Sequence, residues 1–142
     1  MRIGAILLAA LALTACGGHS QPSAESVARQ WSAALNRNDN ESAGRLFADG
    51  AEIVQNGEET LQTHADAVRW NAGLPCGGRI TDVERHGKHE VLAIFQLKER
   101  PQHRCDAPGG VAAALFQVED GKIVLWHQSE VPERFRPSGQ TV

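Results

Sequence analysis

Apolar residues recur at helical spacing in the first half of the chain and alternate with polar residues in the second half. Ser23, a residue type that caps helix N-termini, precedes apolar positions spaced i, i+4, i+7 and i+8. This spacing predicts a first helix that ends at the turn-forming residues 36–40. Its buried face would comprise Val27, Trp31, Ala34 and Leu35.

Shorter elements follow between residues 41 and 71. Asp49-Gly50 is expected to stop a second helix, and Asn56-Gly57 is a strong signal for a tight hairpin turn. Thr63 and Asp66 have the spacing of a capping box at the start of a third helix. The predicted elements are a helix at 41–48, strands at 51–55 and 58–61, and a helix from 63 to 71 that Gly73, Pro75 and Gly77-Gly78 terminate.

Strand-like alternation dominates after residue 78. Turns at His86-Gly87-Lys88 and Asp120-Gly121, and a long loop at 100–110, separate the alternating runs. The pattern predicts a four-stranded antiparallel meander with strands at 79–85, 89–99, 111–119 and 122–130.

The segment "FQVEDGKIVLWHQ", Phe116 to Gln128, together with this element order, resembles the nuclear transport factor 2-like (NTF2-like) superfamily, including its SnoaL-like branch. The resemblance covers residues 24–131 and implies an α+β fold. In it, three N-terminal helices pack on a curved, mainly antiparallel sheet, and this cone has a cavity at its open end. Members include isomerases, dehydratases, cyclases, epoxide hydrolases, binding modules and dimeric assembly domains. Residues 132–142 would form a loosely held tail.

The N-terminus is typical of an export signal. Arg2 is followed by an eleven-residue apolar run, Ile3 to Leu13, whereas a membrane-spanning helix needs about 20 apolar residues. Leu13-Thr14-Ala15-Cys16 resembles the lipobox of bacterial lipoprotein precursors, which implies removal of residues 1–15 and a lipid on Cys16. Residues 16–23 would then be a tether on the membrane. Gly17, by analogy with enterobacterial lipoproteins, favours the outer membrane and a domain that faces the periplasm; an ordinary secretory signal with an incidental Cys16 is the alternative.

The net charge and the number of cysteines limit the classes of partner and ligand that the protein can bind. The formal net charge of −3 becomes −4 when Arg2 is removed with the signal, so the chain offers no basic face for nucleic acid. Cys76 and Cys105 would form a disulfide in an oxidising compartment, and antiparallel pairing brings them to one sheet edge. A metal site that includes His103 is the alternative, but no closely spaced CxxC pair supports it. We expect no metal and no cofactor.

The resemblance places the cavity between the first helix and the last strand. Trp31 would line it, and if Trp126 points inward, alternation places Val124, Gln128 and Glu130 on the same face. The opposite register turns Leu125, His127 and Ser129 inward instead. Aromatic surface with one polar end suits a small apolar ligand.

Acid–base catalysis would need a general base in the cavity. Glu130 is the candidate if Trp126 points inward, and His127 is the candidate in the opposite register. The chain contains no tyrosine, so the tyrosine-based arrangements of isomerase and dehydratase relatives have no counterpart. Asp66 and Arg69 have the spacing of an ordinary surface pair on a helix. The sequence therefore favours a non-catalytic ligand-binding or protein-interaction module, which could pair with a second copy through its sheet. The alternative is a small-molecule isomerase or hydrolase.

Overall fold

The computed structural model describes residue 18 and residues 20–139. The predicted signal segment 1–15 and the lipidation candidate Cys16 lie outside these residues. None of the helices in the described part of the chain has the length and apolar character needed to cross a membrane.

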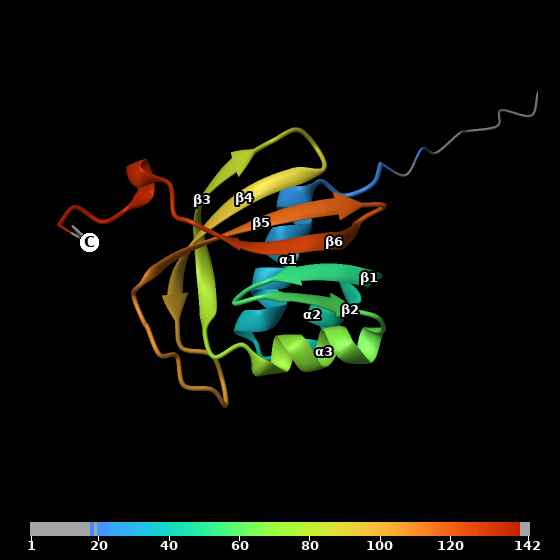
Figure 1. Ribbon diagram of the computed structural model, residues 1–142, viewed down its shortest axis with the longest axis horizontal. Coiled ribbons are helices and arrows are strands. Elements are labelled where there is room, and N and C mark those ends of the chain that lie inside the picture. The colour runs from blue at the N-terminus through green and yellow to red at the C-terminus, as the bar shows by residue number, and fades with distance from the viewer. Residues whose placement is uncertain (1–17, 19, 140–142) are drawn as a thin grey trace, which may run out of the picture.

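The fold is α+β, as the sequence predicts. Three helices cover one face of a curved, unclosed six-stranded sheet with the order β2-β1-β6-β5-β4-β3 (Figure 1). Neighbouring strands are antiparallel except for β1 and β6, which are parallel. The elements are α1 (Ala24–Asn36), α2 (Asn40–Arg45), β1 (Phe47–Val54), β2 (Glu58–Leu61), α3 (His64–Gly73), β3 (Gly77–Arg85), β4 (Glu90–Lys98), β5 (Val111–Glu119), β6 (Lys122–Ser129) and a 3-10 turn, η1 (Glu133–Phe135).

Both predicted helix caps form. The Ser23 side chain accepts a hydrogen bond from the Ser26 backbone N–H at 3.1 Å. At α3, Thr63 and Asp66 each accept from the other's backbone N–H, which completes the capping box. Local side-chain chemistry thus sets where these two helices begin.

The boundary between α2 and β1 differs from the prediction. The helix ends at Arg45, and β1 already begins at Phe47, so Asp49-Gly50 lies within a strand. Gly50 has a φ of +82°, and the pairing of β1 with β6 is irregular between Phe47 and Glu52. A turn-forming pair can interrupt a strand as well as stop a helix, and here it produces an irregularity in the ladder.

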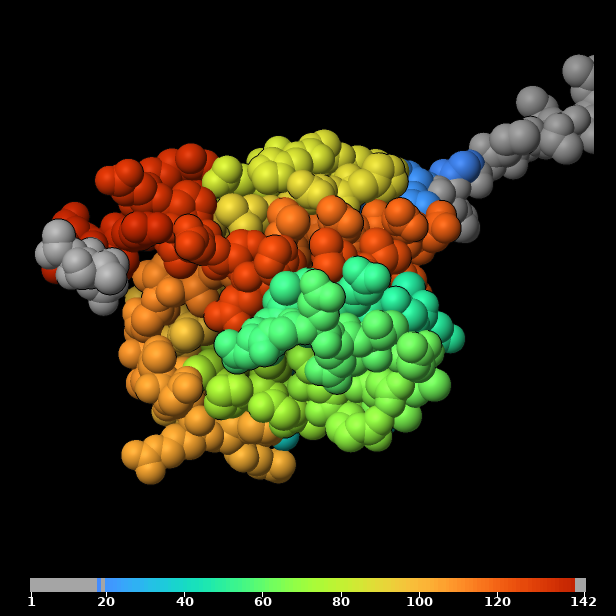
Figure 2. Space-filling view, viewed as in Figure 1, coloured from blue at the N-terminus to red at the C-terminus, as the bar shows by residue number. Residues whose placement is uncertain are grey.

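Two apolar clusters lie on opposite faces of the sheet. The larger cluster fills the space between the helices and the concave face. The smaller cluster, on the outer face, has Leu92, Ile94 and Ala113 at its centre, with Val131 and Phe135 packed against it. The segment expected to be a loose tail therefore contacts the sheet, and Arg134 forms an ion pair with Glu84 of β3 at 2.6 Å. Figure 2 shows this segment, in red, beside β3 at one end of the molecule.

Candidate functional site

A cavity of about 420 Å³ opens at the end of the cone where α1 ends and β3 begins. Three buried aromatic residues, Trp31, Phe95 and Trp126, line it together with small residues of β5. Polar side chains also contribute to its lining: Gln55, Asn56, Asp106 and Gln128. The volume is within the range of small-molecule pockets, about 300–1,000 Å³.

The register of β6 decides which predicted residues reach this cavity. Val118 pairs with Ile123 and Gln117 with Leu125, so Val124 is the extra residue of a bulge. Ile123 and Trp126 consequently both lie in the core, although they are three residues apart.

Beyond the bulge, the strand alternates regularly. Gln128 shares the cavity face with Trp126, whereas His127 lies on the other face and is absent from the cavity lining. Glu130 follows the last residue of β6, is exposed and is also absent from the lining. The cavity therefore brings together Trp31, Trp126 and Gln128, and it does not include the two candidate bases.

The aromatic side chains form one connected cluster. The ring centroids of Trp31 and Trp126 lie 6.0 Å apart, and those of Trp70 and Trp126 lie 5.0 Å apart in an edge-to-face arrangement. Trp31 donates its indole N–H to Oδ1 of Asn71 at 2.7 Å, and Asn71 is fully buried. The chain contains three tryptophans, and all of them belong to this cluster.

The wall on the side of β3 requires glycine. Asn36, at the end of α1, accepts from the Gly78 N–H and donates to the Gly78 carbonyl, both at 2.9 Å. A Cβ at Gly77 would collide with Oδ1 of Asn36, and one at Gly78 would lie 2.9 Å from the Phe95 ring. The Gly77-Gly78 pair thus lets the strand approach α1 closely at the cavity.

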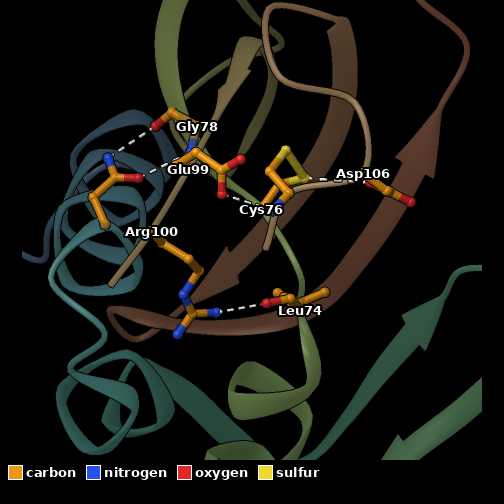
Figure 3. Close-up of a disulfide and its surroundings, with 8 residues drawn as sticks. Leu74, Cys76, Gly78, Glu99, Arg100 and Asp106 are labelled. Atoms are coloured by element: carbon orange, nitrogen blue, oxygen red, sulfur yellow. Dashed lines mark hydrogen bonds between the residues drawn. A yellow bond between two sulfur atoms is a disulfide. The ribbon is translucent and has the colours of Figure 1, made fainter. Parts of the chain in front are cut away.

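Arg100, in the loop after β4, joins three segments beside the cavity. Its guanidinium donates to the backbone carbonyls of Asn71 and Leu74 at 2.9 Å and to the side-chain oxygens of Asn38 and Asn40 at 2.7 Å. Figure 3 shows the bond to Leu74, a residue that lines the cavity. Arg100 is 3% exposed, and burial lowers the pKa of its guanidinium below the ordinary value. No carboxylate within the described residues pairs with it, so neutral oxygens alone stabilise this buried charge.

A disulfide between Cys76 and Cys105 holds the same loop to the start of β3 (Figure 3). The Cys105 backbone N–H donates to Oε2 of Glu99 at 2.8 Å, and Asp106 Oδ1 lies 3.4 Å from Cys76 Sγ. Asp106 completes a group of potential metal-ligand atoms with the two sulfurs. Because the sulfurs are bonded to each other, they are not available as thiolate ligands. His103 instead contacts the Ala72 carbonyl through Nε2 at 2.8 Å.

Asp66 and Arg69 form an ion pair on α3, as the spacing predicts. They line a second hollow next to the cavity, and the two hollows share Gln55, Gly73 and Leu74.

Sequence reasoning did not single out Asn71 or Arg100. The partners of both lie far along the chain: Trp31 is 40 residues from Asn71, and the partners of Arg100 are between 26 and 62 residues away. An asparagine in an otherwise apolar helix stripe would have been the only local signal, and an arginine in a polar loop gives none.

Comparisons with known proteins find similarity at the level of structure. No protein-family model matches the sequence. No curated protein matches it either. An NTF2-like protein of unknown function from Cytophaga hutchinsonii is similar to this chain with a TM-score of 0.62 and 13% identity, over 78% of this chain and 92% of that one.

Two further structures carry a proposed activity. A proposed polyketide cyclase from Sinorhizobium meliloti has a TM-score of 0.60 and 16% identity, over 72% of this chain and 93% of that one. A proposed ketosteroid isomerase from Kribbella flavida has a TM-score of 0.57 and 18% identity, over 81% and 88%. The helix order, the sheet order and these likenesses agree: this chain has the NTF2-like fold.

Proposed function

We propose that this protein is a non-catalytic binding module that holds a small apolar molecule in the cavity at the open end of the cone. The composition of the cavity lining is the observation that carries this proposal. Aromatic rings and small aliphatic residues form most of the lining, and the polar contribution comes mainly from amides. Burial of an apolar molecule against such a surface is energetically favourable, and the few polar groups can orient the molecule.

The placement of the candidate bases supports binding over catalysis. Glu130 and His127 are absent from the cavity lining, and the one carboxylate present, Asp106, is exposed and lies beside the disulfide. A general base has to come within hydrogen-bond reach of the proton that it removes. We therefore expect Glu130→Gln and His127→Ala to leave ligand affinity unchanged. If the wild-type protein turned over a substrate, and either substitution abolished this activity without loss of stability, the enzyme alternative would be supported instead.

Binding can be tested with the neutral fluorescent probe N-phenyl-1-naphthylamine. Ala112 lies opposite Phe95 in the β4–β5 ladder and lines the cavity, so Ala112→Leu would fill part of it. Ala33→Leu makes the same change at an exposed position of α1 and is the matched control. We expect Ala112→Leu to weaken probe binding at least about tenfold while the circular dichroism spectrum is retained. Equal affinity in both variants would show that the probe binds elsewhere.

The proposal includes the membrane anchor that the sequence predicts. Lipid on Cys16 would place the domain in the bacterial cell envelope, on the periplasmic side of the outer membrane. The order of positive residue, apolar run and cysteine supports this assignment. Expression of the full chain with Cys16→Ala should move the protein from the membrane fraction to the soluble fraction. Mass spectrometry of the purified N-terminal peptide should find an acylated Cys16, and an unmodified cysteine there would contradict the anchor.

A further inference from the structure

Residues 131–136, which follow β6, form a strap across the outer face of the sheet. Val131 and Phe135 pack against the outer apolar cluster, whose centre lies on β4 and β5. Arg134 reaches one strand further and forms its ion pair with Glu84 of β3. Because the strands follow one another in the order β6-β5-β4-β3, the strap starts at β6, passes over β5 and β4, and ends at the edge strand.

Contacts within the strap link its apolar side chain to its charged one. The Phe135 backbone N–H donates to the Pro132 carbonyl at 2.9 Å, and Nε of Arg136 donates to the Val131 carbonyl at 2.9 Å. The guanidinium of Arg134 lies 4.7 Å from the centre of the Phe135 ring, within the range of a cation–π contact. The ring on the apolar cluster and the cation on β3 therefore hold each other in place, and loss of one contact weakens the other.

The strap covers an apolar patch of the outer sheet face. Leu92, Ile94 and Ala113, at the centre of the patch, are at most 9% exposed. Apart from the strap, the half-buried side chains packed against them are Val111 and Leu115 of β5. Without the strap, these five neighbouring apolar residues would face solvent together. Contiguous apolar patches on a soluble protein mark interaction surfaces, and two sheet faces pack on each other at a spacing of about 10 Å.

We propose that the strap keeps the protein monomeric, because it occupies the sheet face on which a second copy of the chain would otherwise pack. A second copy is the partner that this face fits, since every molecule carries the same patch and two identical faces can meet about a two-fold axis. The ion pair of Arg134 with Glu84 holds the strap closed: Oε2 of Glu84 is buried, and Arg134 is the cation that lies against it. Neither the cavity nor its ligand has a part in this role.

Reversal of one charge tests whether the ion pair closes the strap. In Arg134→Glu, two carboxylates oppose each other, so the strap should detach. Chymotrypsin should then cleave after Phe135 about five- to tenfold faster, because proteases cut segments that have opened. The double variant Glu84→Arg/Arg134→Glu restores the pair with exchanged charges, and its cleavage rate should return towards that of the parent chain. Arg104→Glu makes the same change at an exposed site in the loop after β4 and is the matched control.

Sedimentation equilibrium of the same chains tests the role of the strap in association. All of them carry Cys16→Ala in addition, so that no lipid contributes to association. The parent chain, the Arg104→Glu control and the double variant should be monomers, and Arg134→Glu should form a concentration-dependent dimer. Addition of Leu115→Lys to Arg134→Glu places a charge on the uncovered patch and should restore the monomer.

The rescue by the double variant separates release of the strap from unfolding of the domain. A parent chain that is already a dimer would overturn the inference. So would an Arg134→Glu variant that is cleaved faster and stays monomeric, or one that is cleaved no faster than the Arg104→Glu control. A dimer that persisted after Leu115→Lys would place the interface elsewhere and overturn it as well.

Discussion

The indole rings of Trp31 and Trp126 lie 6.0 Å apart with their planes at 54°, yet their N–H groups have opposite environments. The N–H of Trp31 is bonded within the core to Asn71, whereas that of Trp126 has no acceptor in the described residues. The Trp31 ring is therefore held by a hydrogen bond within the core, whereas the Trp126 ring is held by its packing against the other aromatic rings.

The first prediction concerns the Trp31–Asn71 bond. Asn71→Leu keeps a side chain of similar size but leaves the Trp31 N–H without an acceptor, so we expect a loss of about 1–3 kcal/mol in the free energy of unfolding. Urea unfolding followed by circular dichroism measures this loss. Gln30→Leu makes a comparable change at an exposed position of α1 and is the control. Equal stability of the two variants would contradict the structural role.

The second prediction concerns Arg100. Arg100→Met removes the four hydrogen bonds that join the loop after β4 to the α1–α2 turn and the end of α3, so it should cost about 2–4 kcal/mol of unfolding free energy. Arg100→Lys retains the charge without the planar fork and should lie between wild type and methionine. Arg79→Met, at an exposed arginine with one bond to Gln96, is the control. If Arg100→Met were as stable as that control, the four hydrogen bonds of Arg100 would not contribute to stability.

The third prediction concerns the disulfide. Cys76 and Cys105 are 29 residues apart, and the chain-entropy model gives about 3.5 kcal/mol for closing such a loop. The double variant Cys76→Ala/Cys105→Ala should unfold at a correspondingly lower urea concentration. Dithiothreitol should lower the stability of wild type to a similar level and leave the double variant unchanged. If the reductant had no effect on wild type, the bridge would not contribute to stability.

The fourth prediction concerns acid. Hydrogen bonds from Arg85 and from Arg29 lower the pKa of Glu25 below its ordinary value of 4.5. A depressed folded-state pKa adds stability above the unfolded value, and this contribution is lost as the pH falls through the folded value. Glu25→Gln should therefore have a lower melting temperature than wild type at pH 6–7, and the gap should close below about pH 4. Glu58→Gln, at an exposed site on β2, is the matched control. A gap that persisted unchanged at low pH would exclude this ionic contribution.

The sequence predicted the meander more accurately than the segment before it. The strand Val111–Glu119 begins and ends where the alternation and the Asp120-Gly121 turn place it, and both turn residues have the positive φ that such a turn requires, +48° and +74°. Asp49-Gly50 misled the prediction because the same residue pair suits a helix stop and an irregular strand. Parallel pairing of β1 with β6 depends on contacts between distant segments, and no local pattern reports it.

The residues of the candidate site were likewise predicted only in part. Alternation along β6 placed Trp126 and Gln128 on one face, but the bulge at Val124 and the end of the strand before Glu130 depend on the partner strand. The buried polar residues were the hardest to find, since Nη1 and Nη2 of Arg100 donate to backbone carbonyls and side-chain amides that a sequence does not bring together. Periodicity therefore grouped the residues that share a face of β6, and only the tertiary contacts identified which face lines the cavity and which groups hold its wall.

The direction of α1 has a consequence for how a tethered domain would meet its ligand. The backbone N–H of Ala24, the first residue of α1, donates a hydrogen bond to the carbonyl of Lys88 in the β3–β4 turn. Leu35, near the other end of α1, lines the cavity. A helix of 13 residues spans about 20 Å, so residues 20–23, which lead into it, and the cavity mouth lie at its opposite ends. If Cys16 carries the proposed lipid, the chain is therefore attached at the end of α1 that lies farther from the mouth. A ligand would then reach the mouth without passing the point of attachment.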